Sequence, residues 1–216
     1  MHGMDVVVAG GHGQIGLRLL RLLADGGHRA RGLIRNPDHA GELSAAGAEP
    51  VVCDMEALED LSECCAGADA VVFAAGAGPG SGPERKRTVD YGGAVKLIEA
   101  AEALGVRRYL MVSSMGAGDP ASASEELRPY QQAKHDADEA LASSDLDWTI
   151  VRPGRLTNAP GSGTVDLAPR LGRYGEVPRQ DVAAVLLAVL GAENTVRGTY
   201  ELLGGDVAVD EAVRSL

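Results

Sequence analysis

Residues 4–25 read MDVVVAGGHGQIGLRLLRLLAD, and this stretch decides the fold. The apolar run from Met4 to Ala9 predicts a buried strand. Gln14 to Asp25 carries leucine and isoleucine at helical spacing and is followed by two glycines, which predicts a helix with a glycine stop. Between the two lies the turn GGHGQIG, residues 10–16. A strand, a glycine-rich turn and a helix in this order are typical of the start of a nucleotide-binding α/β protein.

The glycine turn satisfies two overlapping spacings, GxGxxG from Gly11 and GxxGxxG from Gly10. The first glycines permit the tight turn, Gly13 lets the backbone approach a pyrophosphate, and Gly16 lets helix and strand pack closely. The amides and dipole of the helix then hold the anion. The alternative is a glycine-rich turn that binds nothing. The cofactor site predicted here consists of Gly10, Gly11, Gly13, Gln14, Ile15 and Gly16.

Short apolar runs alternate with helical patterns along the rest of the chain. We expect strands at 28–35, 49–53, 70–74, 108–113, 147–152 and 199–203. We expect helices at 36–47, 57–65, 85–104, 129–143, 181–190 (capped by Asp181) and 210–216. This pattern predicts an α/β protein with a Rossmann-type, doubly wound parallel sheet and helices on both faces. We expect one domain over residues 1–216, in which 153–216 is a short substrate-binding portion that contributes most of the substrate side.

Composition excludes several classes of function. The net charge of −11 and the pI near 4.9 argue against nonspecific nucleic-acid binding, which requires clustered lysine and arginine. The longest strongly apolar run, 182–192, is too short to span a bilayer, and the first residues show no basic flank before an apolar stretch, so we expect a cytoplasmic protein without a membrane partner. Three cysteines and five scattered histidines show no metal-ligand spacing, and we expect no metal site. The sequence does not fix an oligomeric state.

Three long connections follow predicted strands, at 76–84, 115–128 and 153–179. In a parallel sheet they gather at the carboxyl edge, where open α/β sheets bind ligands. Their glycine, proline and serine content suits the walls of a pocket for a small-molecule substrate.

The end of the second predicted strand distinguishes NADP from NAD. Residues 31–37 read RGLIRNP, which places Arg35 and Asn36 there and no carboxylate. An arginine suits the 2′-phosphate of NADP, whereas a carboxylate would repel it. We therefore expect NADP, with NAD less favoured. The alternative for Arg35 is a solvated surface arginine.

Two further strand ends contribute candidate cofactor contacts. The Asp54 carboxylate suits the adenine amino group while Met55 packs on the ring; as an alternative of equal weight, Asp54 caps the helix before Ala57. The fourth strand ends in small residues that let the backbone approach the cofactor, or that merely form a turn. These small residues are Ala74, Ala75 and Gly76.

A candidate catalytic set follows the fifth strand. Tyr130 and Lys134 lie four residues apart on a predicted helix, so both project from one face. We expect the lysine to lower the pKa of the tyrosine and make it a usable acid or base. Ser113 and Ser114 end the fifth strand on the same sheet edge, and either one suits polarising a substrate carbonyl. The alternative is a surface pair and two serines that satisfy loop backbone.

Together, GGHGQIG, VDYGGAVKLIEAAEALGVRRYLMVSSMGAG (residues 89–118), YxxxK and DWTIVRPGRLT (147–157) resemble the short-chain dehydrogenase/reductase superfamily. The resemblance is strongest to its atypical, extended-like NAD(P)H-binding members and covers nearly the whole chain. It implies a Rossmann fold, an NADP(H) or NAD(H) cofactor, and a Ser-Tyr-Lys set. In that set Tyr130 transfers the proton, Lys134 also binds the nicotinamide ribose, and Ser114 or Ser113 polarises the substrate oxygen. Pro153 matches the segment beside the nicotinamide.

One departure from the extended pattern concerns Asp90, in VDYGGAVK, where many extended members carry asparagine. The resemblance implies an NADP-dependent oxidoreductase acting on a small carbonyl, quinone or flavin-like acceptor. Two alternatives are an NAD(P)-binding redox sensor without turnover and an epimerase-like enzyme that retains its cofactor.

Overall fold

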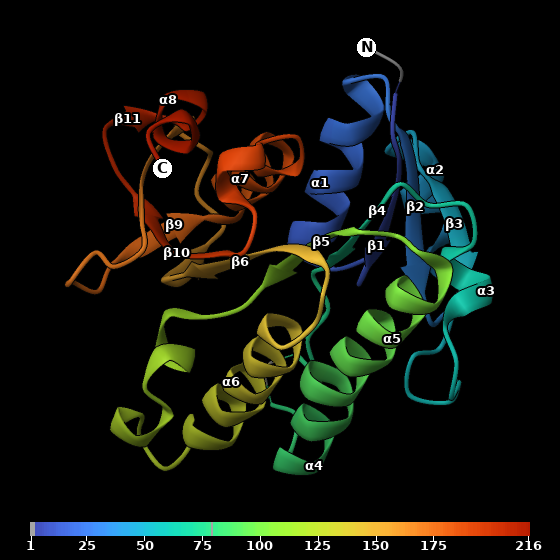
Figure 1. Ribbon diagram of the computed structural model, residues 1–216, viewed down its shortest axis with the longest axis horizontal. Helices are drawn as coiled ribbons and strands as arrows, with labels where there is room; N and C mark the ends of the chain where they lie inside the picture. The colour runs from blue at the N-terminus through green and yellow to red at the C-terminus, as the bar shows by residue number, and fades with distance from the viewer. Residues whose placement is uncertain (1–2, 79) are drawn as a thin grey trace.

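The computed structural model describes residues 3–78 and 80–216 and confirms the predicted Rossmann-type α/β fold (Figure 1). Its strands are β1 (Asp5–Ala9), β2 (Arg29–Ile34), β3 (Glu49–Val52), β4 (Ala70–Phe73), β5 (Arg108–Val112), β6 (Asp147–Pro153), β7 (Arg155–Thr157), β8 (Thr164–Ala168), β9 (Glu176–Pro178), β10 (Gly198–Gly204) and β11 (Val207–Ala208). Its α-helices are α1 (Gln14–Asp25), α2 (Ala40–Ala45), α3 (Ser62–Cys65), α4 (Pro83–Arg85), α5 (Ala94–Leu104), α6 (Arg128–Ala142), α7 (Arg179–Leu190) and α8 (Val209–Arg214). A π-helical segment, η2 (Lys86–Gly93), joins α4 to α5.

Within these residues the main sheet has nine strands in the order β11-β8-β10-β6-β5-β4-β1-β2-β3. The strands from β3 to β10 in this order pair in parallel. The chain runs outward from β1 to β3 and then returns to place β4 on the other side of β1. The carboxyl ends of β1 and β4 therefore form a topological switch point, where open α/β sheets bind ligands.

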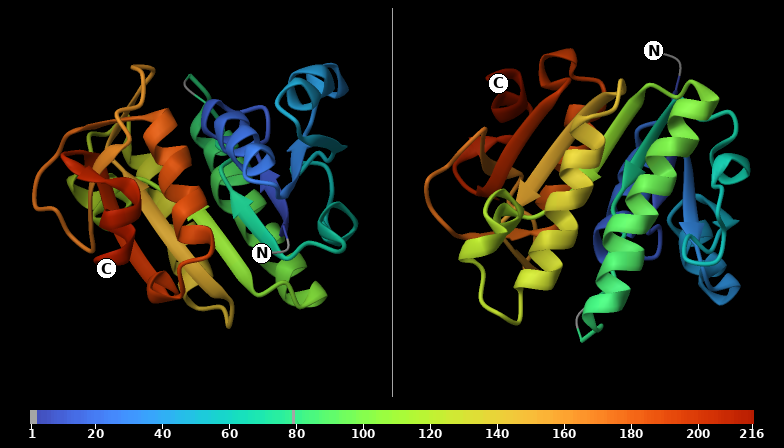
Figure 2. Two further views of the ribbon diagram at one scale, coloured as in Figure 1. Left: turned by 90° about the horizontal axis from the view of Figure 1, so that it is seen from above. Right: turned by 60° about the horizontal axis from the view of Figure 1, so that its bottom comes forward.

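The core lies on both faces of the sheet (Figure 2). Successive side chains of a strand point to opposite faces, so Val6 and Val8 of β1 pack with α1, α2, α7 and α8. Val7 and Ala9 pack on the other face with α3, α5 and α6. This two-sided burial explains why the central strands are nearly continuous runs of apolar residues.

The carboxyl-terminal part of the sheet differs from the prediction. The connection expected over 153–179 contains β7, β8 and β9, and β8 pairs antiparallel with β10, so the sheet is mixed rather than wholly parallel. The sequence of β8, TVDLA, is too short and too polar to stand out as a buried strand. The segment expected to line the substrate pocket therefore contains β-strands as well as loops.

Two predicted helices were wrong in their extent. The helix expected over 57–65 forms only at Ser62–Cys65, because the Asp54 and Asp60 carboxylates accept hydrogen bonds from the amides of residues 56 and 62 and hold turns there. The long helix expected over 85–104 is interrupted by η2.

The predicted cap of α7 was also wrong. Asp181 lies inside the first turn of α7, and Pro178 is the N-cap. The buried Asp181 carboxylate instead accepts hydrogen bonds from the amides of Ser162 and Gly163, at 3.0 and 2.9 Å. It thereby ties the loop before β8 to α7. None of the helices in the described part of the chain combines the length and the apolarity needed to cross a membrane.

Candidate functional site

The glycine turn is shaped by close backbone approaches. Gly10 follows β1 with a φ of +80°, and a Cβ there would lie 2.7 Å from the Cα of Ala75. A Cβ on Gly16 would lie 2.2 Å from the Gly10 carbonyl oxygen, and one on Gly11 would lie 2.8 Å from the Cα of Gly32. A side chain at Gly10 or Gly11 would push the turn away from the backbone near β4 or β2, and one at Gly16 would push α1 away from the turn.

The glycine turn leads directly into the first residues of α1. Gly13 is its N-cap and provides no side-chain cap, so the first amides of this 12-residue helix have no side-chain partner. Such a helix end attracts anions. Gln14 and Ile15 begin the helix directly behind it and line a cavity described below.

A cavity of about 280 Å³, which we call the arginine cavity, lies beside the glycine turn at the carboxyl ends of β1 to β4. It gathers most of the candidate cofactor residues, which come from four separate segments. Its walls include Gly10, Gly13, Arg35, Asn36, Asp54, Met55, Ala74, Ala75 and Gly76, together with His12, His39, Glu56 and Arg85.

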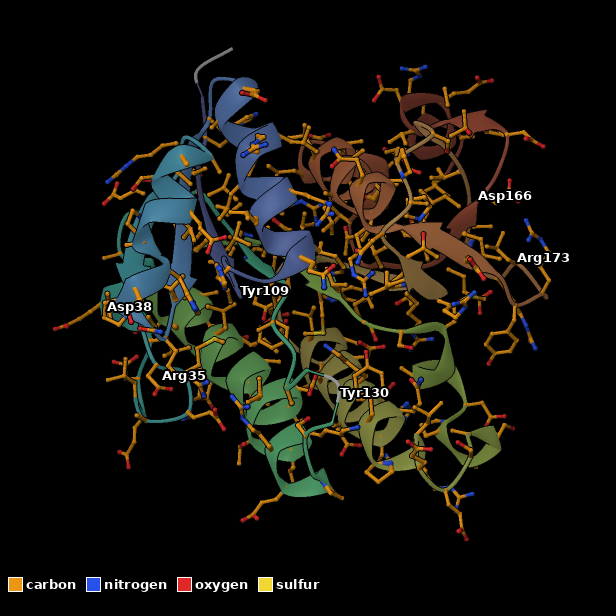
Figure 3. The ribbon with its side chains drawn as sticks, turned by 180° about the vertical axis from the view of Figure 1, so that it is seen from behind. Arg35, Asp38, Tyr109, Tyr130, Asp166 and Arg173 are labelled. Atoms are coloured by element: carbon orange, nitrogen blue, oxygen red, sulfur yellow. The ribbon has the colours of Figure 1, made fainter. Side chains whose placement is uncertain are left out.

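Three of these residues make contacts that define their local roles. The Asn36 side chain accepts a hydrogen bond from the amide of Asp38 and caps the short turn that follows β2. The Asp54 carboxylate accepts from the amide of Glu56 at 2.9 Å and holds a turn; it does not cap a helix before Ala57, as one alternative expected, because the helix begins only at Ser62. Arg35 Nη1 donates to the Glu56 carboxylate at 3.0 Å. Arg35 and Tyr130 lie on different elements of the molecule (Figure 3).

A second cavity of about 400 Å³, the tyrosine cavity, adjoins the first and shares Gly13, Ala74 and Gly76 with it. Its other walls include Gln14, Ile15, Lys86, Asp90, Ser113, Tyr130, Lys134, Leu156 and Arg179. The two cavities together follow the carboxyl edge of the sheet on either side of the glycine turn. This arrangement suits one elongated ligand with a different chemical group at each end.

Lys134 is held inside the tyrosine cavity by a buried ion pair. Its Nζ lies 3.3 Å from the Asp90 carboxylate, and only 3% of Lys134 and 0% of Asp90 is exposed. The same Nζ donates to the carbonyl oxygens of Ala75 and Val112, at 3.3 and 3.2 Å. Asp90 also accepts from the amide of Ala77. The π-helical segment η2 carries Asp90 to this position, and π-helical turns frequently occur at functional sites.

Tyr130 lies one helical turn before Lys134, as expected, but its pKa is shifted in the direction opposite to the prediction. Burial raises the pKa of Tyr130, and the charges of Asp90 and Asp138 raise it further. Lys134 and the neighbouring Ser114 hydroxyl lower it, without overcoming burial. The expectation of a lowered pKa was wrong because burial outweighs the charge of Lys134, which the charges of Asp90 and Asp138 also oppose. Tyr130 therefore carries its proton at neutral pH.

The two serines at the end of β5 have different partners. Ser114 is the serine whose hydroxyl lowers the pKa of Tyr130. Ser113 is buried and donates to the Asp138 carboxylate at 2.8 Å, which also accepts from Arg152 Nε at 2.9 Å. Burial raises the pKa of Asp138, while Arg152 and Ser113 oppose that shift. Asp138 was not identified from the sequence, although it lies four residues after Lys134 on the same face of α6.

Other wall residues also escaped the sequence analysis. The rings of His12 and His39 stack with centroids 3.6 Å apart, and both line the arginine cavity. Glu56 and Arg85 meet there from different segments. Pro153, by contrast, is buried at the end of β6 and lines neither of the two cavities, whereas Leu156 and Arg179 do line the tyrosine cavity.

This chain is similar to known proteins in both sequence and structure. A family model described as NAD(P)H-binding matches residues 10–193. YhfK of Bacillus subtilis (strain 168), described as an uncharacterised sugar epimerase, is 41% identical over 215 residues, which are 99% of this chain and 100% of that protein.

Two solved structures are similar over the full chain. A putative NAD-dependent epimerase/dehydratase from Bacillus halodurans has a TM-score of 0.95 at 39% identity, covering 99% of this chain and 100% of that one. The oxidoreductase ylbE from Lactococcus lactis has a TM-score of 0.86 at 26% identity, covering 99% of this chain and 96% of that one. The chain is thus similar to proteins described as epimerases and as an oxidoreductase.

Proposed function

Because this chain belongs to the NAD(P)H-binding family, we propose that it is an NADP-dependent oxidoreductase. It transfers a hydride between the nicotinamide and a small carbonyl, quinone or flavin-like acceptor, and Tyr130 exchanges the proton. The predicted resemblance to atypical members of the short-chain dehydrogenase/reductase superfamily is confirmed by the family match and the fold of solved relatives. The observation that carries the proposal is that Tyr130 and Lys134 line a cavity sharing walls with the glycine turn.

The walls of the two cavities fit a dinucleotide. Gly10 and Gly16 permit the tight turn and the close packing of α1 on it, Gly13 lets the backbone approach the pyrophosphate, and the first amides of α1 suit that anion. Arg35 provides a guanidinium for the 2′-phosphate of NADP. The bound cofactor supplies the hydride. In this proposal the adenosine end lies in the arginine cavity and the nicotinamide end in the tyrosine cavity.

The protonation of Tyr130 gives the proposed reaction a direction. Because burial keeps its pKa raised, Tyr130 holds a proton at neutral pH and is suited to donate it to the acceptor oxygen during reduction. The Ser114 hydroxyl, which lowers the pKa of Tyr130, is suited to polarise the acceptor oxygen beside it. Lys134 lowers the pKa of Tyr130 and provides an ammonium group for the nicotinamide ribose.

We further propose that the chain acts as a single domain and that residues 153–216 supply most of the substrate side. Leu156, after β6, and Arg179, at the start of α7, support this assignment because they line the tyrosine cavity from that portion of the chain.

The test of this proposal is NADPH oxidation measured across a panel of quinones, flavins and aldehydes, with Tyr130→Phe beside the wild type. Removal of the hydroxyl is expected to lower kcat by about 10²- to 10⁴-fold, the usual contribution of a positioned proton donor, while NADPH binding is retained. Tyr174→Phe is the matched control, because Tyr174 is 80% exposed. Unchanged turnover by Tyr130→Phe would remove the tyrosine from the mechanism, and tight NADPH binding without turnover on any acceptor would support the sensor alternative.

The descriptions of two relatives favour a second candidate, an epimerase-like enzyme that retains its cofactor. Such an enzyme oxidises and re-reduces one substrate, so the cofactor is not consumed. Incubation with a panel of sugars and nucleotide sugars, followed by NMR, tests this candidate. Interconversion of two epimers without net NADPH oxidation would favour it over the reductase.

A further inference from the structure

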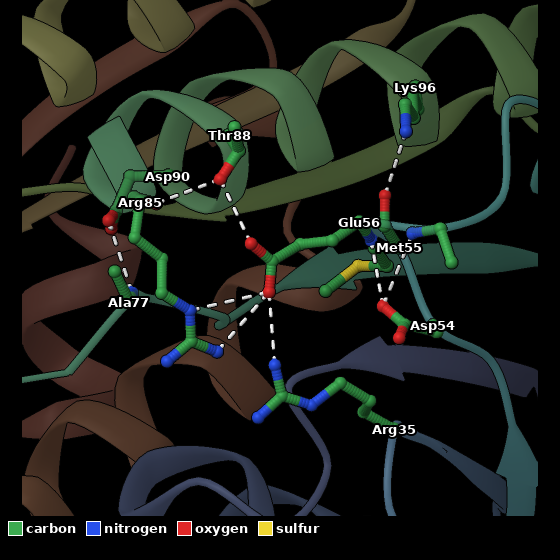
Figure 4. Close-up of polar contacts among 10 residues, drawn as sticks. Arg35, Asp54, Met55, Glu56, Ala77, Arg85, Thr88, Asp90 and Lys96 are labelled. Carbon is green, nitrogen blue, oxygen red and sulfur yellow. Dashed lines mark hydrogen bonds and ion pairs between the residues drawn. The ribbon is translucent and has the colours of Figure 1, made fainter. Parts of the chain in front are cut away.

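The arginine cavity contains an internal ion cluster that the sequence pattern does not explain. Arg35 Nη1 and Arg85 Nη2 both contact the same oxygen of Glu56, Oε2, at 3.0 and 3.2 Å (Figure 4). The other oxygen, Oε1, accepts a hydrogen bond from the Thr88 hydroxyl at 2.9 Å. The Glu56 carboxylate thus lies between two guanidinium groups on the wall of the cavity.

The members of this cluster come from three strand ends. Arg35 follows β2, Glu56 follows β3, and Arg85 belongs to α4 beyond β4. In a parallel sheet these ends meet at the carboxyl edge, next to the glycine turn. Arg35 and Arg85 are 57% and 43% exposed at their side chains, so as a surface ion pair the cluster would contribute little to stability. Its position on the cavity wall is better explained by a ligand.

The charges of the cluster are not balanced. Two guanidinium groups face one carboxylate, which leaves a local charge of +1. The neighbouring Asp54 carboxylate accepts hydrogen bonds from the amides of residues 56 and 57 and forms no ion pair with either guanidinium group (Figure 4). A phosphate monoester carries a charge of about −1.5 to −2 at pH 7 and offers three acceptor oxygens, so it suits two guanidinium groups better than one carboxylate does.

We propose that Arg85 is a second ligand for the 2′-phosphate of the cofactor and that Glu56 is an internal anion that competes with this phosphate. This inference rests on the proposed use of NADP. Glu56 holds the two guanidinium groups near each other and occupies donors that the phosphate oxygens would take. Arg85 therefore strengthens the preference for NADP over NAD, and Glu56 weakens it.

The experiment measures binding of 2′,5′-ADP and of 5′-AMP by calorimetry, because the two probes differ in the 2′-phosphate. The variants are Arg85→Ala, Glu56→Gln and Arg35→Ala. Arg87→Ala is the matched control: Arg87 lies two residues from Arg85, carries the same charge and has a 72% exposed side chain. Thermal unfolding of each variant checks that it is folded.

Arg85→Ala is expected to weaken 2′,5′-ADP binding by about tenfold or more, the usual effect of losing a hydrogen bond to a charged group. Glu56→Gln is expected to strengthen that binding several-fold, and neither change should alter 5′-AMP binding. Arg87→Ala should leave both probes unchanged.

Three results would overturn the inference. Equal losses in Arg85→Ala and Arg87→Ala would show only a long-range charge effect. A loss confined to Arg35→Ala would remove Arg85 from the site and leave the choice of NADP intact. Equal binding of both probes by the wild type would reject the arginine pair and NADP together, whereas hydride transfer and the role of Tyr130 would still be open to test with NADH.

Discussion

The buried pair of Asp90 and Lys134 provides the sharpest test of how the tyrosine cavity is organised. The substitution Asp90→Asn keeps the shape of the side chain and removes its charge. Lys134 would then be a buried ammonium without an anionic partner, held by the carbonyl oxygens of Ala75 and Val112 and by the face of the Phe73 ring. An uncompensated buried charge is costly, so we expect a large loss of stability.

The size of this loss follows from the geometry. Two unit charges 3.3 Å apart attract each other by about 5 kcal/mol at an effective dielectric constant near 20. Removing one partner of a buried ion pair typically costs about 3–5 kcal/mol. For a chain of this length each kcal/mol lowers Tm by roughly 2–4 °C, so we expect a decrease of roughly 6–20 °C.

Thermal unfolding followed by circular dichroism measures this change. Asp136→Asn is the matched control. Asp136 lies on α6, its side chain is 31% exposed, and it pairs with the exposed Arg87 at 3.9 Å. That variant is expected to lose less than about 1 kcal/mol. Similar Tm values for the two variants would show that the buried pair does not stabilise the fold.

The same substitution should change the acidity of Tyr130. The charge of Asp90 raises the pKa of Tyr130, so its removal lowers that pKa. If Tyr130 donates the proton, the basic limb of the pH profile of kcat moves to lower pH in Asp90→Asn. A basic limb that stays in place or moves to higher pH would contradict this coupling.

Three further predictions concern stability and reactivity. Gly16→Ala should lower Tm, since its Cβ would lie 2.2 Å from the Gly10 carbonyl oxygen. Gly41→Ala in α2 should raise Tm, because its Cβ would meet nothing within 4 Å and alanine favours the helix. Equal changes in Tm would contradict the close contact between Gly16 and Gly10. Because the folded pKa of Asp138 is raised, its stabilising effect is present at low pH and is lost as pH rises through that pKa. Relative to Asp138→Asn, the free energy of unfolding of the wild type in urea should therefore be highest near pH 4 and lower at pH 7. The opposite trend would mean that the Arg152 pair dominates. Cys53, Cys64 and Cys65 are buried, and burial raises the pKa of Cys65 to about 12, so a thiol reagent should label them only on unfolding; rapid labelling of the native protein would refute this.

Local sequence patterns predicted the parts of the fold that depend on neighbouring residues. The β1–turn–α1 unit agrees with the expectation closely, because strand, glycine turn and helix are each encoded within 22 residues, 4–25. The spacing of Tyr130 and Lys134 likewise placed both on one face of α6. Their catalytic roles stay predictions.

Contacts between distant segments could not be predicted in the same way. Glu56 lies 21 residues from Arg35 and 29 from Arg85, and only the parallel sheet brings the three together. The stacking of His12 on His39 has the same origin. The pKa of Tyr130 is raised first by burial and then by the charges of Asp90 and Asp138. The position of Asp90 could not be read from a helical pattern because η2 is not α-helical.

The segment η2 also limits how the chain can vary in length. It sends Thr88 to Glu56 in one cavity and Asp90 to Lys134 in the other. In an α-helix each residue turns the chain by about 100°, so deleting one residue from Lys86–Gly93 would draw the segment toward α-helical spacing and rotate one contact away from its partner. Single substitutions on its exposed face leave this spacing unchanged. An insertion or deletion in η2 would therefore break the contact of this segment with one cavity while keeping its contact with the other.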